Sequence, residues 1–269
     1  MALADYDEYL AALKTNRVAD FQSAGSIGRP QRTTALYRYF LPTPVIPTTS
    51  AVTTRDTDIS MGPIPSVGAG RLSLLGGRMN TGGAAGVACI IVDILNHSGG
   101  LSGTSTAAQT TNLPTAALTR YTSGEGVMAA VVIYATVGAT ATTFTVSYTN
   151  QAGTSGRTST ATQIGATNFN GAGTLILIPL AAGDTGVRSV QSVTLAGTTA
   201  SAGNFGVVLF KPVAMMALND VMSAMPIDSV SSGGIIGALA EVQPEACLSV
   251  IVNQITQQTT SGAVILAEV

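Results

Sequence analysis

The sequence predicts a mainly β protein: a β-sandwich or jelly-roll-like domain preceded by an N-terminal helix and an extended arm. Eight short runs rich in Val, Ile and Thr follow one another from about residue 84, separated by clusters of Gly, Asn, Ser and Asp. Six of the 11 prolines lie between residues 23 and 80. These observations divide the chain into four parts. They are a helix at 1–22, an arm at 23–80, a sandwich core at 81–214, and a segment at 215–269 that completes or flanks the sandwich.

The N-terminal segment has a helical apolar pattern. From Leu3 to Leu13 apolar residues recur at three- and four-residue steps, and Phe21 fits the same face. Acidic residues stand where a secretion signal needs positive charge. The most apolar run, residues 126–141, is shorter than the roughly 20 residues of a membrane-spanning helix. We therefore expect a helix at 1–22, no export signal and no membrane span.

The arm at 23–80 combines proline with arginine. Proline favours extended backbone without long hydrogen-bonded ladders, and the glycine-rich residues 68–77 are typical of a flexible turn. Eight of the 12 basic residues lie between residues 14 and 78, and Arg outnumbers Lys ten to two. Arginine and aromatic residues are common anchors of protein interfaces, so the arm is expected to bind a partner; the alternative is that it packs on its own domain. The candidate partner-binding residues are Arg29, Arg32, Tyr37, Arg38, Tyr39, Phe40 and Arg55.

The β region contains several distinct patterns. At 142–150, Phe144, Val146 and Tyr148 alternate with Thr and Ser, which predicts a strand with one buried face. Residues 151–158 (QAGTSGRT) are expected to form a hairpin connection to the next strand. Residues 173–180 (GTLILIPL) are apolar on both faces, which favours a central strand. The Met-rich part of 215–269 fits a short helix or a strand.

Charge is scarce in the β region. Only 10% of all residues are charged, against about 25% in ordinary soluble domains. Residues 94–119, 126–156 and 158–183 contain no Asp, Glu, Lys or Arg. Free monomers normally protect sheet edges and surfaces with charge, so we expect burial against other subunits in a homo-oligomer, with a trimer favoured. A net charge of −2 argues against nucleic acid as a specific ligand.

Motifs for catalysis, cofactors and metals are missing from the sequence. The phosphate-binding, zinc-protease and nucleophile-elbow patterns do not occur. His97 is the one histidine, and we interpret it as a structural residue that follows a strand. Cys89 and Cys247 stand in apolar runs and are expected to be buried. Asp56 and Asp58 supply too few oxygens for a calcium site. We therefore predict no enzyme activity, no cofactor and no metal site.

Three segments resemble structural proteins of tailed bacteriophage virions. They are YTNQAGTSGR at 148–157, GDTGVRSVQSVTL at 183–195 and GVVLFKP at 206–212. The resemblance implies a virion protein that is assembled in the host cytoplasm and contacts other virion proteins. We favour a capsid decoration or cement protein that binds the major capsid lattice through the arm. A head-to-tail, collar or tail protein is the near alternative, and a host-binding adhesin is a further one.

Overall fold

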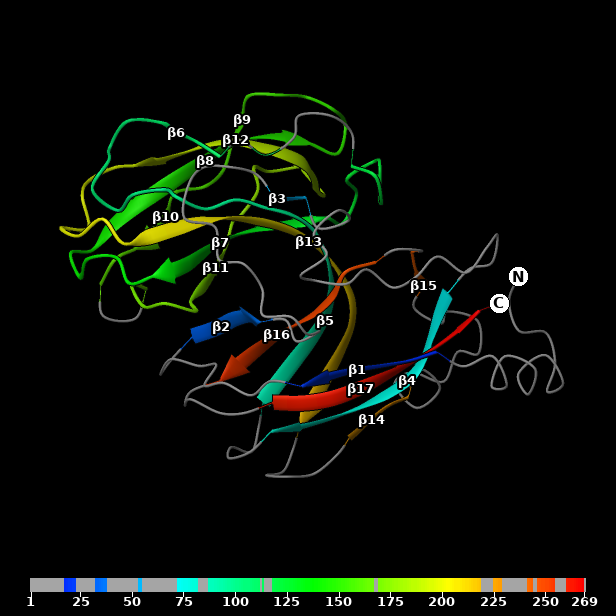
Figure 1. The fold of residues 1–269 in the computed structure, drawn as a ribbon. Helices are drawn as coiled ribbons and strands as arrows, with labels where there is room; N and C mark the ends of the chain where they lie inside the picture. Colours follow the sequence, from blue (N-terminus) through cyan, green and yellow to red (C-terminus); the bar gives the residue numbers. More distant parts are fainter. Residues whose placement is uncertain are drawn as a thin grey trace, which may run out of the picture.

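The computed structural model describes strands in three antiparallel sheets (Figure 1). The described residues contain no helix. They are residues 17–22, 32–37, 53–54, 72–81, 87–111, 113, 118–166, 169–218, 225–228, 241–243, 246–254 and 260–268.

The sandwich consists of two sheets, which lie one above the other in Figure 1. We call them the outer sheet and the shared sheet, because the second contributes to two hydrophobic cores. The outer sheet has the order β10 (Thr162–Ile164), β8 (Thr142–Asn150), β12 (Val187–Leu195) and β6 (Gln109–Thr110), with β9 (Arg157–Thr158) also paired to β8. The shared sheet has the order β11 (Leu175–Leu177), β7 (Met128–Ala135), β13 (Asn204–Leu218), β5 (Val87–His97), β16 (Leu248–Gln254) and β2 (Arg32–Tyr37), with β3 (Thr53–Thr54) paired to β5.

The third sheet, here the terminal sheet, joins strands from both ends of the chain. Its order is β1 (Arg17–Gln22), β17 (Thr260–Glu268), β4 (Leu72–Thr81) and β14 (Met225–Asp228), with β15 (Glu241–Val242) also paired to β4. In Figure 1 the long strands β5 and β13 run from the sandwich toward this sheet.

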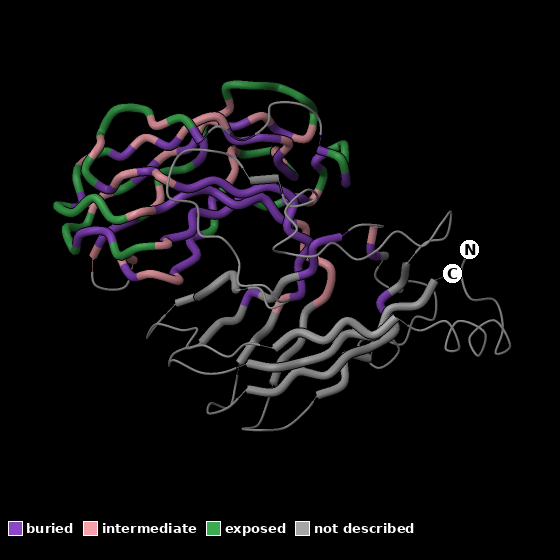
Figure 2. The backbone as a smooth tube through the Cα atoms, in the orientation of Figure 1, coloured by how far each residue is buried: buried purple, intermediate pink, exposed green. Residues whose placement is uncertain are grey.

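The shared sheet buries both of its faces. Val131 of β7 and Val207 of β13 pack in the sandwich core together with Phe144 and Val193 of the outer sheet. The neighbouring residues Val132 and Val208 point to the opposite face, because side chains alternate along a strand. There they form a second core with residues of β5, β11 and β16. This double burial explains why residues 128–134 are apolar almost without alternation. Residues 129–133 are all buried, and Figure 2 draws buried residues in purple.

The predicted sandwich and several of its strands are confirmed. In β8, Phe144, Val146 and Tyr148 are all buried, while the Thr and Ser residues between them are half-buried or exposed. Residues 151–156 connect β8 to β9 as a hairpin, in which Tyr148 pairs with Arg157. Cys247 is buried, as expected. The two interpretations of the Met-rich segment resolve in favour of strand, since Met215 and Met216 lie in β13 and Met225 begins β14.

The prediction of a central strand at 173–180 is wrong. Only Leu175–Leu177 form a strand, and this strand ends the ladder of the shared sheet. Pro179 cannot donate a ladder hydrogen bond, which limits the strand to a short edge position. The side chain of Leu177 is 43% exposed. The long central strands are β7 and β13 instead.

The expected helix and arm also differ from the structure. Residues 1–16 lie outside the described residues, but Arg17–Gln22 form β1 and pair with β17 from Arg17↔Leu266 to Gln22↔Ser261. The helical spacing of apolar residues is regular only as far as Leu13. Beyond it, pairing with β17, as between Val18 and Ile265, determines the structure, so residues 17–22 form a strand although Phe21 fits the helical pattern.

Residues 72–77, expected to belong to a turn, form part of β4. They pair with β17, and a register shift of the kind made by a bulge lies between Leu74 and Gly76. Glycine within a strand commonly marks such a bulge. Strands β2, β3 and β4 thus join the chain's own sheets, and the expected boundary at residue 80 falls inside β4.

Candidate interaction surface

Two of the seven predicted partner-binding residues fall within the described residues. Arg32 and Tyr37 begin and end β2, where they pair with Gln254 and Val250 of β16. The other five, Arg29, Arg38, Tyr39, Phe40 and Arg55, lie outside the described residues. The structure therefore places the backbone of two of them in the shared sheet, and contact with a partner stays a prediction for all seven.

Charged residues of the sandwich gather at one end of it. Between residues 94 and 210 the sequence has five charged residues. They are Arg120, Glu125, Arg157, Asp184 and Arg188. All five lie in or directly after the loops 118–127, 151–156 and 178–186, which the antiparallel strands bring to the same end. We call this the charged end.

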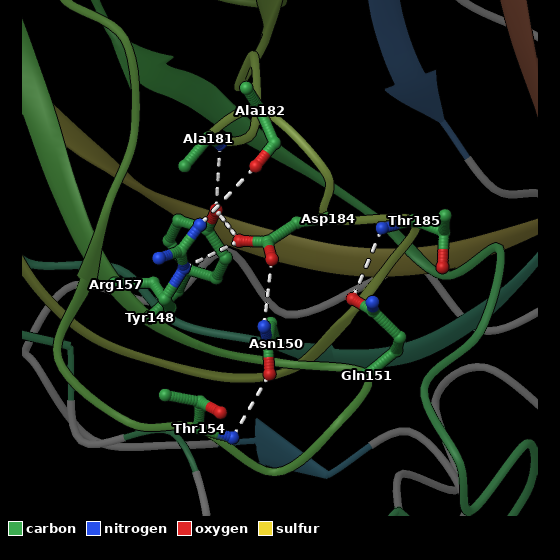
Figure 3. Close-up of polar contacts among 9 residues, drawn as sticks. All are labelled: Tyr148, Asn150, Gln151, Thr154, Arg157, Ala181, Ala182, Asp184 and Thr185. Carbon is green, nitrogen blue, oxygen red and sulfur yellow. Dashed lines mark hydrogen bonds and ion pairs between the residues drawn. The ribbon is translucent and has the colours of Figure 1, made fainter.

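Asp184 is the centre of a hydrogen-bonded cluster at the charged end (Figure 3). Its carboxylate accepts hydrogen bonds from the Tyr148 hydroxyl at 2.5 Å, from Asn150 Nδ2 at 2.7 Å and from Arg157 Nε at 2.9 Å. The side chain of Asp184 is 4% exposed, against 35% for Arg157. The Tyr148 hydroxyl in turn accepts a hydrogen bond from the Ala181 N–H at 2.8 Å. The cluster ties the loop 178–186 to β8 and β9.

The cluster shifts the pKa values of its two acidic members in opposite directions. The hydrogen bonds from Tyr148 and Asn150, with Arg157, lower the pKa of Asp184 from its ordinary 3.8 to about 2. Burial and the hydrogen bond to Asp184 raise the pKa of Tyr148. At neutral pH, Asp184 is therefore a carboxylate and Tyr148 a neutral phenol, and these are the protonation states that the hydrogen bonds of the cluster require.

Asp184 should make the stability of the protein depend on pH in the acid range. Because its pKa is lower in the folded state, the unfolded chain binds more protons between pH 4 and pH 2, and the stabilisation by Asp184 is lost as the pH falls through this window. We expect wild type to have a higher urea midpoint than Asp184→Asn at pH 7, and the difference to shrink as the pH approaches 2. A difference that stayed constant with pH would contradict this role of Asp184.

Two cations clamp the loop 118–127 from the neighbouring strands. Arg188 of β12 donates from Nε to the carbonyl oxygen of Ser123 at 3.1 Å. Lys211 of β13 donates from Nζ to the carbonyl oxygen of Glu125 at 2.9 Å, and the same Nζ lies 5.7 Å from the centre of the Tyr121 ring. These two cations therefore have contacts within the chain.

Asp93 and Arg120 form a buried ion pair between the two cores. Arg120 Nε and Nη2 donate to the two carboxylate oxygens of Asp93 at 2.9 and 3.0 Å, and Nη2 also donates to the Ile94 carbonyl oxygen at 3.0 Å. The Cys247 N–H donates to the same carboxylate at 2.8 Å. Burial raises the pKa of Asp93, while Arg120 and Cys247 act in the opposite direction. The ion pair connects β5 to the loop 118–127, and the hydrogen bond from the Cys247 N–H connects β5 to the segment that leads into β16.

The sequence interpretation missed these clusters, although one signal was available. Arg157 and Asp184 are the two charged residues of the span 126–187 and have opposite signs. In a region with so few charged residues, two residues of opposite charge are expected to form an ion pair. The two segments 148–157 and 183–195, noted above for their resemblance to virion proteins, meet at this ion pair.

The described residues show few features of a metal site or a membrane span. Within the described ranges, no three His, Cys, Asp or Glu side chains lie close enough to hold a metal ion. No helix in the described part of the chain is long and apolar enough to cross a membrane. His97 ends β5 and is 2% exposed. Asp56 and Asp58 lie outside the described residues.

Comparisons with known proteins found distant structural similarity only. No family model matches the sequence, and no curated protein matches it significantly. Among solved structures, the VP2 subviral particle of infectious bursal disease virus is 9% identical over 95% of this chain and 80% of that chain, with a TM-score of 0.19. The T=1 particles derived from the same virus are 9% identical over 95% and 77% of the two chains, with a TM-score of 0.16. TM-scores of this size do not establish a shared fold.

Proposed function

We propose that the protein is a structural component of a virion, specifically a capsid decoration or cement protein of a tailed phage. In this proposal it forms oligomers through its β domain and uses arm residues to bind the major capsid lattice. The observation that carries the proposal is the uncharged surface of the sandwich. Across the span 94–210, every charged residue lies at the charged end, so the rest of the surface that the described residues of this span contribute carries only neutral side chains.

The outer sheet has a row of hydroxyl side chains on one of its faces. Thr110, Ser192, Ser147 and Thr158 are paired across β6, β12, β8 and β9 and are half-buried or exposed. Directly paired residues point to the same face of a sheet, so a row of hydroxyls crosses four strands. Burying hydroxyl groups that find hydrogen-bond partners costs far less than burying charges. Such a face can be covered by another subunit at low desolvation cost, which supports a protein built for assembly.

Oligomerisation is the first test of the proposal. We expect the full chain to elute as a stable oligomer, with a trimer favoured, in size-exclusion chromatography with light scattering at micromolar concentration. The neutral surface is the physical reason, because it lacks the charge that keeps monomers apart. A stable monomer over the whole concentration range would contradict self-assembly.

The arm is best tested by point substitutions. Deleting residues 1–80 would also remove β1 to β4 from their sheets. Changing Arg29, Arg38 and Arg55 together to Glu alters no residue of a described strand. The change should abolish incorporation into particles, measured by immunoblotting of purified virions. Unchanged incorporation would contradict the arm contact. Immunogold labelling on the capsid supports decoration, whereas labelling at the neck or tail would favour the alternative virion roles.

A further inference from the structure

The end of the sandwich opposite the charged end has no charged residue among the residues that the structure describes. It is formed by the loops 98–108, 136–141, 165–166 with 169–174, and 196–203, on the left in Figure 1. We call it the neutral end. Its exposed residues are Thr104, Thr106, Ala107, Ala108, Thr136, Ala139, Thr140, Ala141, Ala196, Thr198, Ala200, Ser201, Ala202 and Gly203. Each is either apolar and small or carries a single hydroxyl, so this end combines hydrogen-bonding groups with no net field.

The loops of the neutral end are bonded to one another. The Gly103 N–H donates to the carbonyl oxygen of Ala202 at 2.7 Å, and the Thr199 N–H donates to that of Gly103 at 2.8 Å. The Thr140 N–H donates to the Thr199 carbonyl oxygen at 3.2 Å. Thr199 is fully buried, and its hydroxyl also accepts from the Gly138 N–H at 3.1 Å. Three loops are thus held together beneath the exposed residues.

Two buried oxygens at the neutral end lack a hydrogen bond within the described residues. They are Asn170 Oδ1 and Thr174 Oγ1, both in the loop 169–174, and Thr174 is 1% exposed. Buried polar atoms in folded proteins nearly always have a partner, since an unmet acceptor costs free energy. Both oxygens are enclosed beneath the surface, so they are not among the groups that the neutral end exposes.

We infer that the neutral end is the surface through which one copy of this chain binds a second copy. This inference rests on the proposed function and specifies which surface makes the oligomer. The lack of charge at the neutral end favours a partner surface that is also neutral. Charged groups of a partner would lose their hydration on binding without gaining an opposite charge. A second copy brings an equally neutral surface. Short side chains on bonded loops also lose little conformational freedom on binding.

The inference is tested by placing a charge at each end of the sandwich. Ala107→Lys and Ala139→Lys each add one ammonium to the neutral end, while Ala152→Lys and Ala182→Lys add the same group to exposed positions of the charged end. Sedimentation velocity of the purified full chain gives the dissociation constant of the oligomer. We expect the neutral-end variants to weaken association by about tenfold or more, through burial of an unpaired charge, and the charged-end variants to match wild type. Circular dichroism and thermal melting check that all four variants fold.

The possible outcomes separate this inference from the proposed function. If all four variants associate like wild type, or if the charged-end variants alone dissociate, the neutral end is not the contact and the inference is wrong, while self-assembly stands. Equal weakening by all four would also overturn it, because the effect would then come from net charge. A wild-type chain that stays monomeric would overturn the proposed function itself.

Discussion

Replacing Asp93 by Asn should lower the free energy of unfolding by about 3 to 5 kcal/mol, because Arg120 then remains buried without a counterion. Asp93 is fully buried and accepts hydrogen bonds from Arg120 and from the Cys247 N–H. The substitution keeps the shape of the side chain, removes its charge, and replaces one acceptor oxygen with an NH2 donor that faces the N–H groups of Arg120 or Cys247. Urea unfolding at fixed protein concentration measures the loss.

Two further variants make the Asp93 result interpretable. Glu125→Gln removes the same charge from an exposed position and should stay within about 0.5 kcal/mol of wild type. The double variant Asp93→Leu with Arg120→Met removes both charges and should be more stable than Asp93→Asn, since no charge is left unpaired. A double variant as unstable as the single one would mean that shape, and not charge, determines the loss.

Replacing Gly138 by Ala should destabilise the sandwich by about 2 to 3 kcal/mol through overpacking. A β-carbon at this position would overlap the carbonyl oxygen of Thr199, which is backbone and cannot rotate away. The loop 136–141 would have to separate from the loop 196–203, with loss of the hydrogen bonds that join them. Thermal and urea unfolding of the variant measure the effect.

Gly197 provides the matched control for Gly138. It lies in the neighbouring loop, and a β-carbon there would meet only the Thr142 hydroxyl oxygen at 3.2 Å, a side-chain atom that can move. Gly197→Ala should therefore change the free energy of unfolding by no more than about 0.5 kcal/mol. Equal losses in the two variants would show that backbone freedom, and not close approach of the loops, makes glycine necessary.

Local patterns predicted the sandwich where the pairing partners lie close in sequence. The alternation in β8 and the hairpin to β9 concern residues 142–158, and both are confirmed. Alternation reports which face of a strand is buried, and a glycine-containing link reports a turn. Neither requires knowledge of a distant partner.

The errors arose where a distant partner determines the local structure. Residues 17–22 and 72–81 become strands because β17, at residues 260–268, lies between them in the sheet. Hydrophobicity alone predicts a central strand at 173–180, whereas the order of the strands puts its strand-forming part, Leu175–Leu177, at the end of the sheet. The charged end and the neutral end likewise exist because the directions of the strands decide which loops lie together. Amino-acid composition gives no information on these directions.

The late strands set a time order for folding during synthesis. Strands β6 to β13 are consecutive in the sequence, so the outer sheet and its partner strands β7 and β13 can pair once residue 218 has left the ribosome. Strands β1, β2 and β4 pair with β16 and β17, which are made after the other described strands. Contacts across such long separations form slowly. The nascent sandwich thus precedes the terminal sheet, and the edges of β5 and β4 that β16 and β17 later cover stay unpaired until those two strands have been made.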